Sequence, residues 1–253
     1  MLPSSVTPDP VFGIFPDNLL ELSYMTFCDC KFRQSCTVFK EQFRGVAIVT
    51  SSDFPDIEKD DIILCGSFYA IWPEIRYKFK KFICNAREKD ALVIYDPNFR
   101  KSHLSELDTL KPLIIENMQT ASLIKGSDED FKNIFGVNHP DRAWEIVKNY
   151  CKCLVYTANV EGVYIRTNSF SGKFPVQKIT PVSTIGAGDN FNAGMITSLY
   201  CNEITNDQIE KLSEPEWLKV ITTAVAFATH VCLSYDNYIS ADFAKMTRKR
   251  EDL

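Results

Sequence analysis

Short apolar runs alternate with longer segments of helical periodicity along most of the chain. The short runs are rich in β-branched residues, and several are apolar at successive positions instead of at every second one. Such strands bury both faces, which is typical of a parallel sheet. The predicted strands lie at residues 45–50, 61–66, 91–96, 121–126 and 153–158.

The longer segments predict helices that cover this sheet. Residues 73–89 carry one apolar stripe opposite lysines and arginines. The members of the stripe are Ile75, Phe79, Phe82, Ile83 and Ala86. Residues 105–119 and 142–150 have a similar pattern. Because strands that alternate with helices need crossover connections, the pattern predicts an α/β fold whose mostly parallel sheet is covered on both faces.

The pattern changes in the last third of the chain. Two short alternating runs within residues 162–179 are joined through Ser171 and Gly172, which predicts a hairpin or an antiparallel edge of the sheet. After Gly186 the sequence is mostly helical, and no internal repeat is present. We therefore predict a single α/β domain over residues 1–253.

Composition and charge exclude several classes of protein. Of the 253 residues, 45% are hydrophobic and 24% charged, as in ordinary globular proteins. The net charge of −5 argues against a nucleic-acid-binding protein, which needs a basic surface. The sequence contains no run long and apolar enough to span a bilayer and no signal-peptide pattern at its start. We expect a cytoplasmic protein without nucleic-acid or membrane partners.

The cysteines do not predict a metal site. The nine Cys include no CxxC pair, and the three His are scattered. A zinc site usually needs two such pairs, or His at fixed spacing. We interpret the thiols as reduced side chains that pack as small hydrophobes.

The segment richest in chemistry is PVSTIGAGDNFNAG, residues 181–194. A Gly-Ala-Gly turn here precedes an apolar-periodic helix that includes Phe191, Ile196 and Leu199. Gly186 and Gly188 let the backbone approach a ligand closely. The first amides of the helix and the positive end of its dipole then favour an anion. This turn predicts an anion-binding site suited to a phosphate.

Asp189 in the same turn has two interpretations. It is either an ordinary acid of a helix's first turn, or a general base that takes the proton of an attacking hydroxyl. Its spacing alone does not choose between them. The chain has neither GxGxxG nor GxxxxGK[ST], so neither a dinucleotide fingerprint nor a Walker-type loop explains the anion site.

TIGAGDNFNAG is similar to the C-terminal signature of the ribokinase-like (PfkB) carbohydrate kinases. YDPNFR at 95–100, KGSDED at 125–130 and VYTANVEGVYI at 155–165 are further landmarks in that family's order. The resemblance covers roughly residues 54–244. It implies a three-layer α/β sandwich around a mostly parallel sheet, with residues 53–253 as the ATP-binding and catalytic core. The implied activity is ATP-dependent phosphorylation of a hydroxyl of a sugar or sugar-like small molecule.

The resemblance also implies roles for single residues and two cofactors, ATP and Mg²⁺. Asp189 would be the catalytic base, and Gly186, Ala187 and Gly188 would form the anion hole. Asn98 and Arg100 would line the phosphate and substrate cleft, and Asp130 would belong to the Mg²⁺–phosphate network. The residues expected to contact the nucleotide are Ser127, Thr157, Asn159, Gly162, Ala224 and Asn237.

Three positions depart from the family pattern. Ser127-x-x-Asp130 replaces the usual Asn-x-x-Glu, and it is also a capping box, a role compatible with the first. Ser183-Thr184 stands where the family often has Asp-Thr, which makes K⁺ activation doubtful. Asn159 replaces the usual Gly of the nucleotide turn, and Asn tolerates a left-handed backbone better than most residues.

The front of the chain departs further. Residues 1–52, which include Cys28, Cys30 and Cys36, match no part of the family, and the chain has no Gly-Gly pair. The family places its lid and acceptor pocket there, so we expect either that the lid and pocket are reduced, missing or rebuilt, or that the sequence as given lacks internal pieces. Lids of such kinases exclude water and often form dimers, so a homodimer remains a candidate assembly. Two alternatives to a sugar kinase stay open: a non-catalytic nucleotide-binding relic of the same fold, and a nucleoside or vitamin-precursor kinase.

Overall fold

A computed structural model of the chain describes residues 36–40, 45–49, 54–59 and 61–251. Eight strands within these residues form one sheet, in the order β2-β1-β3-β4-β5-β6-β7-β8. The strands are β1 (Cys36–Lys40), β2 (Gly45–Val49), β3 (Ile62–Gly66), β4 (Leu92–Asp96), β5 (Leu123–Ser127), β6 (Cys153–Thr157), β7 (Val163–Thr167) and β8 (Ser171–Phe174). The five strands predicted from the apolar runs are β2 to β6, with ends shifted by no more than two residues.

The centre of the sheet is parallel and its two sides are antiparallel. Strands β3, β4, β5 and β6 pair in parallel, whereas β1 pairs antiparallel with both β2 and β3. On the other side, β7 pairs antiparallel with both β6 and β8. Only β1 and β7 therefore run against the other described strands, which confirms the mostly parallel sheet.

The predicted hairpin is present as β7 and β8, but its turn and second strand were placed too late in the sequence, because β8 ends at Phe174, where the second predicted run (174–179) begins. Ser171 begins β8, and Gly172 pairs with Ile165 inside the sheet. The turn lies just before, where the N–H of Thr167 donates to the Phe170 carbonyl at 2.8 Å. The Thr167 hydroxyl also accepts from the Phe170 N–H at 2.9 Å. A threonine side chain therefore closes the turn, as such side chains often do, and no glycine is needed there.

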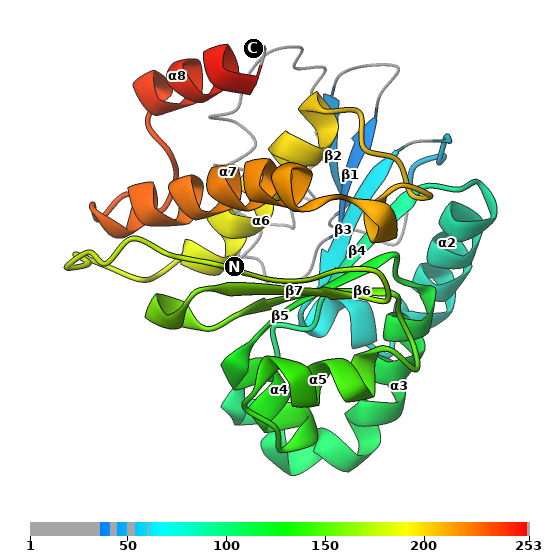
Figure 1. The fold of residues 1–253 in the computed structure, drawn as a ribbon. Coiled ribbons are helices and arrows are strands. Elements are labelled where there is room, and N and C mark those ends of the chain that lie inside the picture. Colours follow the sequence, from blue (N-terminus) through cyan, green and yellow to red (C-terminus); the bar gives the residue numbers. More distant parts are fainter. Residues whose placement is uncertain (1–35, 41–44, 50–53, 60, 252–253) are drawn as a thin grey trace, which may run out of the picture.

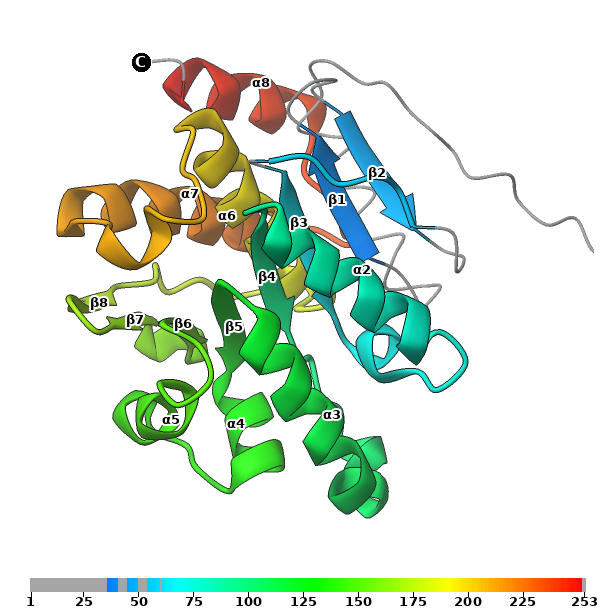
Figure 2. The same cartoon turned by 90° about the vertical axis from the view of Figure 1, so that its right-hand side faces the viewer.

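Helices cover both faces of the sheet (Figures 1 and 2). One face carries α2 (Arg76–Glu88), α3 (Leu107–Thr120), α4 (Asp128–Phe135) and α5 (Pro140–Val147), and the other carries α6 (Ala187–Cys201), α7 (Glu214–Cys232) and α8 (Ala241–Glu251). Short 3-10 helices form η1 (Phe68–Ile71), η2 (Lys101–Glu106), η3 (Asn159–Glu161) and η4 (Ile209–Lys211).

The alternation of side chains along the central strands explains the two helical layers. Ile63, Tyr95 and Tyr156 belong to the apolar cluster that contains the buried residues of α2 to α5. Their neighbours Ile62 and Ile94 belong to a second cluster, with α6 and α7. Successive residues point to opposite faces of a strand, so a strand buried on both faces must be apolar throughout. This confirms the three-layer sandwich.

The part of residues 1–52 that the structure describes adds to the sheet. β1 and β2 extend the sheet beyond β3 and form one of its edges, at the upper right of Figure 2. Residues 1–35, 41–44 and 50–53 lie outside the described part, so the predictions about the lid, Cys28 and Cys30 fall there. Among the described cysteines, Cys65, Cys151, Cys153 and Cys232 are buried free thiols, as predicted, whereas Cys84 is half-buried and Cys201 is exposed. No helix in the described part combines the length and apolarity needed to cross a membrane.

Candidate active site

The predicted site residues gather at one edge of the sheet. The parallel strands β3, β4, β5 and β6 all end at the same edge, where ligands usually bind in open α/β sheets. Asn98 and Arg100 follow β4, Ser127 ends β5, and Thr157 ends β6. The topology therefore brings together residues that are up to 60 positions apart in the sequence.

The amino end of α6 has no side-chain cap. Gly186 occupies the N-cap with φ of 80°, a left-handed conformation that favours glycine, and it has no side chain to cap the helix. By contrast, capping boxes close the amino ends of α4 and α7. Asp189 lies in the first turn of α6 and is partly exposed, and Gly188 is exposed. Among the described residues, no side-chain cap closes this turn, and, apart from its chain neighbours and the backbone of the helix, the only atom within 4 Å of a Cβ placed on Gly188 is Lys125 Nζ, at 3.7 Å.

Asn190 ties this turn to the loop that follows α7. Its Nδ2 donates to the Gly186 carbonyl and to the Asn237 carbonyl, each at 3.0 Å. The Ala187 N–H donates to the Thr184 carbonyl at 3.3 Å, so the turn is also closed from within. Asn237, predicted to contact the nucleotide, thus lies directly beside the turn predicted to bind its phosphates.

A buried ion pair between Lys125 and Asp96 lies next to the Gly186–Asp189 turn. The Lys125 ammonium lies 2.9 Å from Asp96 Oδ2, with only 7% and 10% of the two side chains exposed. Asn192 of α6 donates from Nδ2 to the same oxygen at 2.7 Å. The Lys125 Nζ also lies 3.7 Å from the position that a Cβ on Gly188 would occupy. The network therefore joins β4 and β5 to the amino end of α6.

Sequence reasoning missed this network. It placed the 125–130 turn near the phosphate but assigned no role to Lys125, Asp96 or Asn192. A signal was present, since Asp96 ends one apolar strand and Lys125 interrupts the next. Charged residues are rarely buried without a partner, and these two are each other's partner.

The electrostatics of the cluster favour a charged Lys125. Burial by itself would lower its pKa, but the carboxylates of Asp96, Asp130 and Asp189 outweigh burial and raise the pKa above its usual value. Burial, followed by the nearby Asp96 carboxylate, raises the pKa of Asp130. The Lys125 ammonium is thus attracted by three carboxylates, and one of these, Asp189, is the predicted base.

Asp130 serves the fold through both of its oxygens. The predicted capping box is present: Oδ2 accepts from the Ser127 N–H at 2.8 Å and from the Ser127 hydroxyl at 2.6 Å. Oδ1 accepts from the Phe99 N–H at 2.7 Å, and the residue is 6% exposed. This carboxylate holds the loop after β4, and its predicted link to a Mg²⁺–phosphate network would have to be indirect. Among the described residues, no group of three His, Cys, Asp or Glu could hold a metal ion.

The loops after β4 and β6 contain unusual backbone conformations. Asn98 has φ of 41°, and its N–H donates to Asp96 Oδ1 at 3.2 Å. Arg100 is exposed at the start of η2. Asn159 has φ of 51°, which confirms that it adopts the left-handed backbone expected there. Gly162 is buried, and a Cβ on it would lie 2.6 Å from the Phe174 carbonyl oxygen, so it is required for packing against β8.

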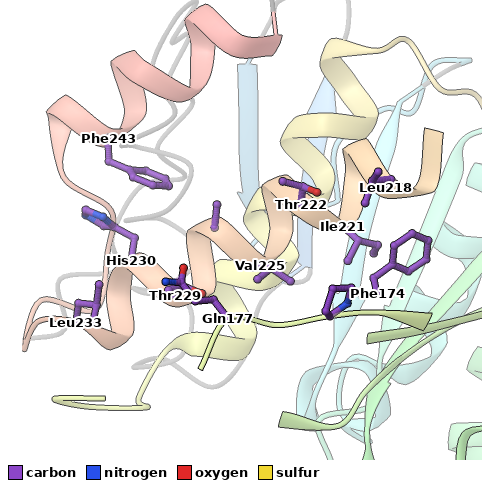
Figure 3. Close-up of a pocket in the computed structure, with 12 residues that line it drawn as sticks. Phe174, Gln177, Leu218, Ile221, Thr222, Val225, Thr229, His230, Leu233 and Phe243 are labelled. Atoms are coloured by element: carbon purple, nitrogen blue, oxygen red, sulfur yellow. The ribbon is translucent and has the colours of Figure 1, made fainter. Parts of the chain in front are cut away.

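A groove of about 430 Å³ runs along α7 (Figure 3). Phe174 and Leu218 lie at one end of it, and His230 and Phe243 at the other. Its lining is Phe174, Pro175, Gln177, Leu218, Ile221, Thr222, Val225, Ala226, Thr229, His230, Leu233 and Phe243. The lining is mostly apolar, with polar groups from Gln177, Thr222, Thr229 and His230. The Gly186–Asp189 turn does not line this groove.

Ala224 lies on the other side of α7. It is 0% exposed and packs against α6, where its Cα lies 2.8 Å from the position of a Cβ on Gly194. Its side chain therefore supports the helix pair and does not face the groove, and its nucleotide contact stays a prediction. The neighbouring residues Thr222, Val225 and Ala226 do line the groove. Residues that are close in the sequence of a helix therefore differ in accessibility, according to the face on which they lie.

His230 gives the groove a pH-dependent element. Its Nε2 accepts from the Ser240 N–H at 3.2 Å, its ring lies 4.3 Å from that of Phe243, and partial burial lowers its pKa. The unfolded chain then binds the proton more readily, so stability is lost as pH falls from 6.5 through the lower folded pKa.

We expect His230→Gln to reduce this sensitivity, because Gln carries no titrating group. The measurement is the drop in Tm between about pH 7.5 and about pH 5.5, which should be smaller than in the wild type. His139→Gln, at a side chain 63% exposed, is the control. Equal drops in His230→Gln and wild type would contradict the prediction.

The chain is similar to proteins that are named as sugar kinases. It is 25% identical to a fructokinase of Rhizobium leguminosarum bv. trifolii over 215 residues, which cover 84% of this chain and 62% of the relative. The solved aminoimidazole riboside kinase of Salmonella enterica, complexed with aminoimidazole riboside and an ATP analog, superposes with a TM-score of 0.63 at 21% identity. The overlap covers 73% of this chain and 61% of that one.

A fructokinase of Vibrio cholerae O395, solved with fructose, ADP and calcium ion, gives a TM-score of 0.65 at 19% identity, over 77% of this chain and 64% of that one. These structures confirm the ribokinase-like α/β fold. The chain spans less than two thirds of the length of each of these relatives. The pfkB family carbohydrate kinase pattern matches residues 49–233, well over half of the sequence. The chain therefore belongs to the pfkB family of carbohydrate kinases.

Proposed function

We propose that this chain is an ATP-dependent kinase that phosphorylates a hydroxyl of a sugar or sugar-like small molecule. The observation that carries the proposal is the uncapped amino end of α6 with a partly exposed Asp189 in its first turn. It stands beside a buried ammonium at the ligand-binding edge of a parallel sheet. Phosphoryl transfer requires positioning and charge stabilisation more than covalent chemistry, and this arrangement supplies both.

The proposed chemistry uses Asp189 as the general base. Its carboxylate accepts the proton of the acceptor hydroxyl while that oxygen bonds to the γ-phosphorus and the bond from this phosphorus to the ADP oxygen breaks. The amides of Gly186 and Gly188, aided by the dipole of α6, stabilise the negative charge on the transferred group, whereas the Ala187 N–H already donates to the Thr184 carbonyl. Asn98 and Arg100 line the cleft on the β4 side.

The groove along α7 supports the nucleotide part of the proposal. Its volume and mostly apolar lining suit a flat heterocycle such as a purine. Hydrogen bonds tie its end to the α6 turn, because the Val182 N–H donates to the Cys232 carbonyl at 2.8 Å and Asn190 binds the Asn237 carbonyl. In this proposal the base occupies the groove and the phosphates extend toward Gly188, past Ser127, Thr157 and Asn159.

Mg²⁺ in this proposal is held by the phosphates and water, because Asp96 and Asp130 already accept hydrogen bonds from the protein. When bound, the ion would supply positive charge to the phosphates. Potassium stays doubtful. The Ser183 hydroxyl, at the position where the family often has Asp, accepts from the Ile185 N–H at 3.2 Å and so shapes the turn.

The direct test is an ATP-consumption assay on the purified chain over a panel of sugars, nucleosides and hydroxymethyl heterocycles. Fructose and aminoimidazole riboside come first, because relatives carry those names. We expect turnover of at least one sugar and a rise in Tm with ATP. A rise in Tm without turnover of any panel member would favour the nucleotide-binding relic. The absence of both would contradict the proposal.

Two further parts of the proposal concern the cell and the assembly. We propose a cytoplasmic enzyme that acts on small molecules, and a homodimer remains a prediction for sedimentation or light scattering. Turnover of a nucleoside in preference to every sugar would move the assignment to a nucleoside kinase.

A further inference from the structure

Lys125 has a donor capacity that the described residues do not use. A lysine ammonium carries three N–H donors. The described residues give it one hydrogen bond, to Asp96 Oδ2, although the residue is only 5% exposed. Donors that remain on a buried charge usually point to a ligand or to bound water. The open side of this ammonium is the Gly188 turn, where a Cβ would lie 3.7 Å from Nζ.

The charges around Lys125 strengthen this argument. The charged groups that face it are Asp96 from β4, Asp130 from α4 and Asp189 from α6. A phosphoryl group that approached Asp189 would be repelled by these carboxylates unless a cation stood between them. Lys125 is placed where that cation is needed, on the strand next to the Asp96 carboxylate and below the α6 turn.

We propose that Lys125 is a further catalytic residue whose ammonium contacts the transferred phosphoryl group, with Asp96 and Asn192 as positioning residues that hold it under the turn. The inference rests on the proposed kinase function and deepens it. Lys125 adds a fixed positive charge beside the backbone amides, and no proton leaves it during the transfer.

The alternative is a purely structural ion pair. Removing one partner of a buried pair leaves an unpaired charge and is strongly destabilising, whereas neutralising both partners with similar shapes is often tolerated. Asp96→Asn together with Lys125→Met removes both charges and leaves an amide near Asn192. This double variant therefore separates stability from catalysis.

The experiment measures kcat, the KM for the sugar and the Tm of wild type, Lys125→Met and the double variant. We expect the double variant to keep a Tm near wild type and to lose about 100-fold in kcat, with the sugar KM changed little. Lys125→Met should lose as much in kcat and also lose stability. Lys152→Met removes an exposed ion pair with Glu210 at the opposite end of β6, and it should change neither quantity.

The outcomes distinguish this inference from the proposed function. Turnover within about threefold of wild type in the double variant would overturn the role of Lys125 while leaving the kinase assignment intact. No turnover by the wild type would contradict the kinase assignment itself.

If neither variant folds, ¹⁵N NMR of the lysine ammonium groups in the wild-type protein tests whether Lys125 contacts the transferred phosphoryl group. Addition of ADP, Mg²⁺ and aluminium fluoride should shift the buried, slowly exchanging ammonium signal. An unchanged signal in a protein shown to bind this mixture would equally overturn the proposal.

Discussion

Replacement of Asp189 by Asn is expected to lower kcat by about a thousandfold, the range typical for loss of a general base. The amide has nearly the same shape as the carboxylate but cannot accept the proton of the acceptor hydroxyl. The N–H groups of the Gly186–Gly188 turn are unchanged by the substitution, so ATP affinity should stay within a few-fold of wild type. Steady-state kinetics and calorimetric titration with a non-hydrolysable ATP analogue measure the two quantities.

Asp108→Asn is the matched control for this result. Asp108 is also an acid in the first turn of a helix, α3, and it is exposed. Its replacement should leave kcat unchanged. If Asp189→Asn kept near-normal turnover, Asp189 would be an ordinary first-turn acid, which is the other interpretation its sequence position allows.

Replacement of Gly194 by Val is expected to destabilise the protein by about 3 kcal/mol, the upper part of the usual range for overpacking. A Cβ on Gly194 would lie 2.8 Å from the Ala224 Cα and 2.8 Å from the Thr223 carbonyl oxygen, and 2.9 Å from the Phe227 ring. Two of these contacts are backbone, so α6 and α7 would have to separate. We expect Tm to fall by roughly 6–12 °C in thermal unfolding.

The same substitution should weaken nucleotide binding, because α6 carries the Gly186–Asp189 turn and α7 lines the groove. Cys201→Val places the same β-branched side chain at an exposed position of α6 and controls for helix propensity. If Gly194→Val had the same Tm as Cys201→Val, α6 and α7 would accommodate the added side chain without loss of stability, and the prediction would be wrong.

The strands and the main helices could be predicted from the sequence because their signals are local. Both faces of β3 to β6 are buried, so the apolar runs are nearly continuous and stand out against their polar flanks. The hairpin was also predictable, but its turn was not. Thr167 closes the turn through its side chain, whereas Gly172, the residue that indicated a turn, lies within β8.

The candidate site was predictable only where one segment contains its chemistry. The Gly-Ala-Gly turn, Asp189 and the Ser127–Asp130 capping box each lie within a few residues of sequence, and the structure has the turn at the amino end of a helix and the box as predicted. The burial of Ala224 was not predictable, because a helix presents opposite faces to the core and to the groove, and only the packing against Gly194 shows which face is buried.

The sequence by itself determined the alternation of strands and helices, the location of the Gly-Ala-Gly turn at the amino end of α6, and the family. Only the tertiary structure decided which distant side chains meet beneath that turn. Asp96 and Asn192 are 96 positions apart, and Asp96 and Lys125 are 29 apart. Their meeting depends on the register of β4 against β5 and on the packing of α6 over the sheet. Such contacts arise from the sum of many packing interactions along the chain, and no local pattern encodes them.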